Sequence, residues 1–164
     1  MSIRHCWLGL VGLGRIARAT ARKMAGFRMR ILAADPYLTG ASNEPGVDLV
    51  SLETVLRESD LVSVHVPLTP ETRGLINEAA FRSMKPTAVI VNTSRGPVID
   101  QPALERALEE KWIAGAALTI CTILWTAGSW TQERAIERYG PRRLDQIGFG
   151  ILVVMQNEWP VAAA

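Results

Sequence analysis

The chain has 164 residues, 48% of them hydrophobic and 21% charged, which is the composition of one soluble globular domain with a buried core. Its formal net charge of +2 favours neither a nucleic acid nor a membrane surface as a partner, and no apolar run reaches the length of a membrane span. Cys6 and Cys121 lack metal-ligand spacing and the N-terminus lacks the pattern of a signal peptide, so we expect reduced thiols, no metal and a cytoplasmic protein.

Strand and helix signals alternate along the chain from residue 7 to residue 118. Apolar runs typical of buried strands occupy residues 7–11, 31–34, 61–66, 88–91 and 113–118. Helices are predicted between them, over residues 15–25, 51–58, 78–84 and from 101 onward. Ser51, Asn77 and Asp100 each precede a predicted helix, where a side-chain oxygen can cap free backbone N–H groups.

This alternation predicts the fold class. Parallel strands need crossover connections, and these are usually helical. We therefore expect an α/β protein with a Rossmann-like, doubly wound parallel sheet and helices on both faces. From Thr119 onward the strand and helix signals are hard to place, although Ser129 with Gln132 could open a helix that closes at Gly140 and Pro141.

Residues 12–17, Gly-Leu-Gly-Arg-Ile-Ala, fit the pattern G-x-G-x-x-G/A between a predicted strand and a predicted helix. Gly12 permits a tight turn, and Gly14 lets the backbone approach a pyrophosphate. The helix that begins at Arg15 offers free N–H groups and a positive dipole to that pyrophosphate. A glycine turn without a ligand is the alternative, which the position of the pattern between strand and helix makes the weaker one.

Asp35 stands at the end of the second apolar run, 23 positions after Gly12. A carboxylate at this position can accept hydrogen bonds from the hydroxyls of an adenosine ribose, and it would repel a 2'-phosphate. Pro36 and Tyr37, which follow, supply no arginine for such a phosphate. The pattern favours NAD over NADP, with a turn-forming aspartate before proline as the alternative.

Two polar segments come at the carboxyl ends of later strands, where ligands of such sheets bind. Residues 65–69 read His-Val-Pro-Leu-Thr and residues 92–96 read Asn-Thr-Ser-Arg-Gly. The planar guanidinium of Arg95 is suited to clamp a carboxylate, and from chemistry alone a surface arginine is an equal alternative. A histidine in an apolar run, as His65 is, is more often packed and hydrogen-bonded than catalytic.

These motifs together resemble the NAD-binding domain of the D-isomer-specific 2-hydroxyacid dehydrogenases, the group that includes phosphoglycerate dehydrogenase. The resemblance extends over about residues 7–118. It rests on the glycine motif, on Asp35-Pro36, and on residues 65–72, 92–96 and 115–118.

The resemblance implies an oxidoreductase that transfers hydride between NAD(H) and a small 2-hydroxy or 2-oxo acid. It implies that Arg95 grips the carboxylate and keto oxygen of the substrate. The residues implied to bind the cofactor are Gly12, Gly14, Arg15 and Ile16 at the pyrophosphate, Asp35 at the ribose, and Val66, Pro67, Thr93 and Ser94 along the groove. It also leaves open a homo-oligomer, since relatives usually dimerise through this domain.

The chain departs from the family pattern in three ways. Thr119 stands where the family has an aspartate at the nicotinamide end, no histidine follows His65 to act as the proton donor, and only six residues precede the first strand. We therefore divide the chain into an incomplete NAD-binding domain, residues 1–118, and an atypical tail, residues 119–164. The alternatives to an enzyme are a non-catalytic NAD(H)-binding module and a truncated product without function.

Overall fold

The computed structural model describes residues 6–40, 42–119, 144–146 and 151–155. Its strands form one sheet in the order β3-β2-β1-β4-β5-β6-β8-β7, in which β1 to β6 are parallel and β8 and β7 are antiparallel to their neighbours. The strands are β1 (Trp7–Val11), β2 (Arg30–Ala34), β3 (Val47–Leu49), β4 (Leu61–Val64), β5 (Val89–Asn92), β6 (Gly115–Thr119), β7 (Leu144–Gln146) and β8 (Ile151–Met155). The six parallel strands have the order of a doubly wound nucleotide-binding sheet, which confirms the predicted fold class.

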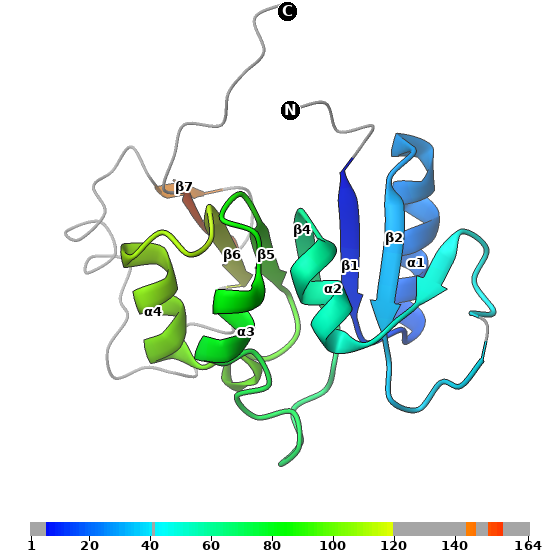
Figure 1. Ribbon diagram of the computed structural model, residues 1–164, viewed down its shortest axis with the longest axis horizontal. Helices are drawn as coiled ribbons and strands as arrows, with labels where there is room; N and C mark the ends of the chain where they lie inside the picture. The colour runs from blue at the N-terminus through cyan, green and yellow to red at the C-terminus, as the bar shows by residue number, and fades with distance from the viewer. Residues whose placement is uncertain (1–5, 41, 120–143, 147–150, 156–164) are drawn as a thin grey trace, which may run out of the picture.

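Helices cover both faces of this sheet, as predicted (Figure 1). They are α1 (Arg15–Met24), α2 (Leu52–Glu58), α3 (Glu78–Ser83) and α4 (Gln101–Glu109), with 3-10 turns η2 (Ala25–Phe27) and η3 (Gly96–Val98). Helix α1 packs Ala17 and Ala21 onto one face, whereas α2, α3 and α4 pack onto the other. The small alanines let α1 lie close to β1 and β2, which brings its N-terminus next to the strand ends.

The three predicted helix caps are present. The side chains of Ser51, Asn77 and Asp100 accept hydrogen bonds from the backbone N–H groups of Thr54, Ala80 and Ala103 at 3.1 Å each. Each bond satisfies one N–H that the helix itself leaves without a partner. These caps fix where α2, α3 and α4 begin, and so fix the loops that lead to them from the sheet edge.

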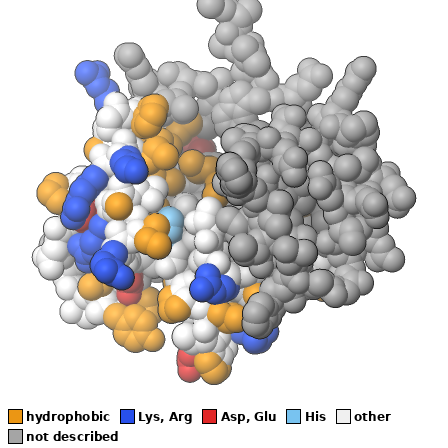
Figure 2. Space-filling model, turned by 180° about the vertical axis from the view of Figure 1, so that it is seen from behind, with side chains coloured by type: hydrophobic (Ala, Val, Ile, Leu, Met, Phe, Trp, Pro, Cys, Tyr) orange, Lys and Arg blue, Asp and Glu red, His pale blue; other side chains and the backbone are white. Residues whose placement is uncertain are grey.

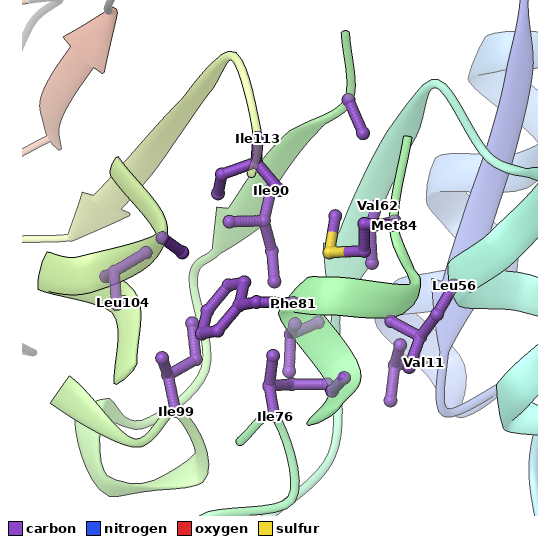
Figure 3. Packing of buried hydrophobic residues seen from close by; sticks show 14 of the residues in the cluster. Val11, Leu56, Val62, Ile76, Phe81, Met84, Ile90, Ile99, Leu104 and Ile113 are labelled. Carbon is purple, nitrogen blue, oxygen red and sulfur yellow. The ribbon is translucent and has the colours of Figure 1, made fainter. Parts of the chain in front are cut away.

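The larger hydrophobic core lies between the sheet and helices α2, α3 and α4. Phe81 of α3 is fully buried at its centre, and Figure 3 shows its ring among Ile90, Ile99 and Leu104. Burying such a side chain contributes about 1.5–3 kcal/mol relative to leaving it in water. This core holds the helix layer in place against β1, β2, β4, β5 and β6.

Two features of the chain differ from the sequence-based expectation. Strand β3, only three residues long, was not predicted, and the strand predicted over 61–66 ends at Val64. In the tail, β8 pairs antiparallel with β6 and β7 with β8, so part of the segment extends the sheet. The helix expected between Ser129 and Pro141 lies outside the described residues.

The loop between β2 and β3 is fixed to α1 by ion pairs. The carboxylate of Glu44 is almost fully buried and accepts two hydrogen bonds from Arg22, at 2.6 and 2.8 Å, while Arg18 lies 3.9 Å away. The hydrogen bonds from Arg22 hold the pKa of Glu44 below its ordinary value. Figure 2 shows basic side chains gathered on the side of the molecule that α1 covers.

We expect Gly9→Ala to destabilise the fold, because a Cβ on β1 would lie 2.7 Å from Cγ1 of Val55 and against Oγ of Ser59. Both neighbours are fully buried, so α2 must move away from the sheet at a cost of about 1–3 kcal/mol, measured by urea unfolding. The matched control is Gly26→Ala, where nothing lies within 4 Å and the change should stay within about 1 kcal/mol. Equal stabilities of the two variants would contradict this packing.

Candidate functional site

The strand order reverses between β1 and β4, and a cleft of about 480 Å³ lies at the carboxyl ends of the strands around this point. Such a reversal leaves a crevice because the connections from the two strands run to opposite sides. The cleft is lined by Val11, Gly12, Gly14, Ala34, Asp35, Pro36, Tyr37, Val50, Ser51, Leu52, His65, Val66, Pro67, Thr69, Glu71, Thr72 and Leu75. It therefore collects residues from the ends of β1, β2, β3 and β4.

The glycine turn forms one wall of the cleft. Gly12 has φ of +89°, and a Cβ there would lie 2.9 Å from Val66 and 3.3 Å from the backbone of His65. Only glycine tolerates both this backbone conformation and this close approach. Gly14 differs, because it is exposed, has ordinary φ and has nothing within 4 Å of its Cβ position. The space beside Gly14 is open to a ligand at the N-terminus of α1.

Asp35 connects the end of β2 to this turn. One carboxylate oxygen accepts a hydrogen bond from the N–H of Leu13 at 2.9 Å, and the other accepts one from the N–H of Tyr37 at 3.0 Å. Each oxygen keeps a further lone pair with which it can accept from a hydroxyl in the cleft. The aspartate thus holds the glycine turn in place and also presents a negative charge to the cleft.

The other residues predicted to hold the cofactor fall into two groups. Val66 and Pro67 line the cleft, together with Gly12, Gly14 and Asp35. Arg15 and Ile16 do not line it but lie exposed on the first turn of α1, where the side chain of Ile16 is 71% exposed. Both residues are two or fewer positions from Gly14, which lines the cleft.

Thr93, Ser94 and Arg95 lie outside this cleft, on the loop that follows β5. The fully buried Asn92 organises that loop by accepting from the N–H and the hydroxyl of Ser94, at 2.9 and 2.7 Å, and by donating to the carbonyl of Arg95 at 3.0 Å. Val64 pairs with Asn92, so the loop begins beside His65. Arg95 is exposed, and one guanidinium nitrogen donates to the carbonyl oxygen of Ser94.

His65 and Glu71 set the electrostatics of the cleft. Burial lowers the pKa of His65 from its ordinary value of 6.5, so the imidazole is neutral at pH 7. Its Nε2 lies 2.9 Å from the hydroxyl of the buried Ser63, the packed and hydrogen-bonded arrangement that the sequence favoured. A hydrogen bond from the Thr69 side chain holds the pKa of Glu71 below its usual range. The cleft therefore contains two carboxylates and a neutral histidine at pH 7.

Sequence reasoning missed two parts of the lining. Val50, Ser51 and Leu52 reach the cleft because β3 ends just before them, and the unpredicted β3 left their position unknown. The sequence does contain a signal for this strand: Val47 and Leu49 alternate with a polar residue, and a Pro-Gly pair, typical of a turn, precedes them. The second part is the loop after β4, where Glu71 belongs to a recognised motif but was not predicted to line the cleft.

The described residues contain neither a candidate metal site nor a helix that could span a membrane. Within ranges 6–40 and 42–119 and the two tail strands, no group of three or more histidine, cysteine, aspartate or glutamate side chains could hold a metal ion. In the same part of the chain, no helix has both the length and the apolar character needed to cross a membrane.

The strand order, the glycine turn and the acid at the end of β2 define a dinucleotide-binding α/β domain. Residues 1–122 match the family model of the D-isomer specific 2-hydroxyacid dehydrogenase NAD binding domain. The chain belongs to this family, which confirms the resemblance seen in its motifs. The family's domain binds an NAD-type dinucleotide.

Individual relatives agree with this assignment. The chain is 55% identical over 114 residues to a glyoxylate reductase of Korarchaeum cryptofilum, covering 69% of this chain and 34% of the relative. It is 47% identical over 112 residues to a D-lactate dehydrogenase of Escherichia coli, covering 68% and 34%. A D-isomer specific 2-hydroxyacid dehydrogenase of Lactobacillus delbrueckii ssp. bulgaricus, solved in its NAD complexed form, matches with a TM-score of 0.72 and 33% identity over 80% of this chain and 40% of that chain. The chain thus spans about a third of the length of the curated relatives it matches.

We expect the free energy of unfolding to fall as the pH is lowered from 7.5 through 6.5. The unfolded chain binds a proton at His65 near pH 6.5, whereas the folded chain binds it only at lower pH, so acid favours unfolding. The slope contributed by one histidine is at most about 1.4 kcal/mol per pH unit. Urea titrations of the wild type and of His65→Gln measure it, and a slope that survives this substitution unchanged would contradict the assignment.

Proposed function

We propose that this chain binds NAD(H) in the cleft between β1 and β4, as the cofactor domain of an oxidoreductase that acts on small 2-hydroxy or 2-oxo acids. The observation that carries the proposal is the joining of the glycine turn to Asp35 by the hydrogen bond from the N–H of Leu13. It sets a phosphate-binding turn and a ribose-binding acid side by side in one cleft of suitable size.

The residues present fit such a dinucleotide. The open space beside Gly14 accommodates a pyrophosphate against the N-terminus of α1, with Arg15 and Ile16 next to it. Asp35 accepts from the ribose hydroxyls, and Val66 and Pro67 supply apolar wall to the groove. Thr93 and Ser94, on the loop after β5 and outside the cleft, would contact the nicotinamide end of the cofactor.

The same geometry favours NAD over NADP. A 2'-phosphate on the adenosine ribose would approach the carboxylates of Asp35 and Glu71, both of which line the cleft. Neither Pro36 nor Tyr37 can pair with it, and no arginine or lysine is among the described residues that line the cleft. Like charges in a partly enclosed site repel strongly enough to discriminate between the two cofactors.

The reaction that this site supports is hydride transfer, for which the bound nicotinamide supplies the hydride. Arg95 would bind the substrate by donating two parallel hydrogen bonds to its carboxylate, and it is exposed and free of any ion pair in the described residues. The names of the relatives, a glyoxylate reductase and a D-lactate dehydrogenase, support small 2-oxo and 2-hydroxy acids as the substrate class.

A second candidate function for the chain by itself is NAD(H) binding without chemistry. Its histidines are at positions 5 and 65 only, and the latter is neutral and hydrogen-bonded to Ser63. The family reaction needs a histidine to supply or remove the proton of the hydroxyl group. This chain, tested alone, is therefore expected to bind the cofactor and not to turn over.

Titration of the purified chain with NADH by calorimetry is expected to show saturable binding at least about tenfold tighter than binding of NADPH. Gly14→Val should abolish binding while the chain stays folded, because the branched side chain enters the pyrophosphate's space and a Cβ at this position has no neighbour within 4 Å. The matched control is Gly26→Val, which also has nothing within 4 Å and lies outside the cleft. Unchanged binding by a folded Gly14→Val variant would show that the glycine turn is not the site.

Turnover is tested by following NADH oxidation with glyoxylate, pyruvate and hydroxypyruvate. We expect a rate at the background level, since clamping by Arg95 does not replace a positioned proton donor. Arg95→Met serves as the control for any rate that is seen. Oxidation above background that this variant reduces a hundredfold or more would establish the chain as an enzyme in its own right.

A further inference from the structure

His65 lines the cleft in which the dinucleotide is proposed to bind. Its backbone N–H donates to the carbonyl oxygen of Val11 at 2.8 Å, and its own carbonyl group lies against the Gly12 turn. The residue lines the same cleft as Gly12 and Gly14 and is half-buried, not sealed in the core. A ligand held by the glycine turn would therefore share one cleft with this imidazole.

The hydroxyl of Ser63 holds the imidazole ring of His65 by a hydrogen bond. Both residues lie on the same face of the sheet, two positions apart, and the Ser63 hydroxyl is 2.9 Å from Nε2. The hydroxyl can donate to Nε2 of a neutral ring or accept from the same nitrogen of a protonated ring, so this bond is compatible with both charge states. Protonation of His65 is consequently compatible with keeping the hydrogen bond to Ser63.

Charged side chains stand on several elements around the cleft, and Arg18 of α1 donates to the carbonyl oxygen of Leu13 in the glycine turn at 3.0 Å. Asp35 comes from the end of β2 and Glu71 from the loop after β4, and both line the cleft. Arg15 stands on the first turn of α1 and Arg95 follows β5, and neither lines it. Burial alone accounts for the lowered pKa of His65, so no fixed charge pairs with the imidazole before a ligand binds.

We propose that dinucleotide binding in this cleft is coupled to protonation of His65, the imidazole taking up a proton when the pyrophosphate settles against the glycine turn. The inference rests on the proposed function and adds a binding residue to it. Two negative charges placed beside an imidazole favour its charged form, whereas loss of water on binding favours the neutral form. The charge effect dominates, because the ring is already half-buried and two full charges arrive at once.

The consequence is an affinity for dinucleotide that depends on pH. Where the imidazole is neutral in the free protein and protonated in the complex, binding strengthens as the pH falls. Each unit by which the ligand raises the pKa of His65 makes binding about tenfold tighter below both pKa values. Above the pKa of the complex, the affinity reaches a constant lower value.

The first experiment is calorimetric titration of the full chain with NADH at pH 8.0 and pH 6.0, in phosphate and in a buffer of high ionisation enthalpy. We expect uptake of a fraction of a proton per NADH at pH 6.0, none at pH 8.0, and a Kd at least threefold lower at pH 6.0. His65→Gln should lose both the uptake and the ratio of the two Kd values. Uptake that persists in this variant, or release of protons by the wild type, would overturn the proposal.

A second measurement needs no substitution in the tested protein. The imidazole resonances of the wild type, followed by NMR against pH, give the pKa of His65 without and with NADH, and His65→Gln assigns the signal. ADP, which carries the two phosphates, should raise that pKa as NADH does, whereas adenosine should not. A pKa that is unchanged by NADH at saturation overturns the proposal while leaving NAD(H) binding intact, and absence of NADH binding at both pH values overturns the two together.

Discussion

The left-handed conformation of Gly12 is the constraint on which the cleft depends. Strand β1 ends there because the turn directs the N–H of Gly12 to the carbonyl oxygen of Ala34, at 2.8 Å, and leaves no room for a side chain beside His65 and Val66. The chain can then enter α1 with its first N–H groups facing the strand ends. Asp35 completes the turn by accepting from Leu13. The ends of β1, β2 and β4 are thus tied together by backbone contacts that any residue other than glycine would break.

Charge is distributed over this framework so that each part of a dinucleotide meets a different environment. The positive end of α1 faces the space beside Gly14, while Asp35 and Glu71 make the adjoining part of the cleft negative. Most of the basic side chains near α1 face outward, and Arg22 is committed to the buried Glu44. The N–H groups and dipole of the α1 terminus therefore stabilise an anionic group beside Gly14. The carboxylates of Asp35 and Glu71 repel an anionic group in the adjoining part of the cleft. This separation supports the proposed preference for a dinucleotide that lacks a 2'-phosphate.

Most of the fold and of the cleft could be predicted from the sequence, and the elements that were not predicted have a physical reason in common. The strands are continuous apolar runs, and Ser51, Asn77 and Asp100 mark helix starts by a local hydrogen bond, so both signals are carried by neighbouring residues. Gly12, Gly14 and Asp35 could be predicted as a group because a glycine motif between a strand and a helix, followed by an acid at the end of the next strand, is a dinucleotide-binding pattern. Of the two glycines, only Gly12 needs the freedom of glycine for its backbone conformation. Strand β3 was missed because its apolar alternation is only three residues long, and its pairing with β2 is a contact that a short local pattern does not reveal. In the tail, β8 pairs with the distant β6, and β7 pairs with β8. Val50 and Glu71 reach the cleft through such tertiary contacts, which spacing along the chain does not encode.

The loop that carries Arg95 is built entirely by contacts within this domain, and this bears on what the domain contributes to catalysis. Asn92 fixes Ser94 and Arg95 from beneath, and the backbone N–H groups of Gly74 and Ile76 donate to the carbonyls of Pro97 and Val98 at 2.8 and 3.1 Å. The loops after β4 and β5 are therefore bonded to each other as well as to the sheet. Arg95 is held in the same framework that holds the glycine turn, so a carboxylate bound by it takes its position from the cofactor cleft. Under the proposed function, this domain would therefore orient the substrate relative to the nicotinamide.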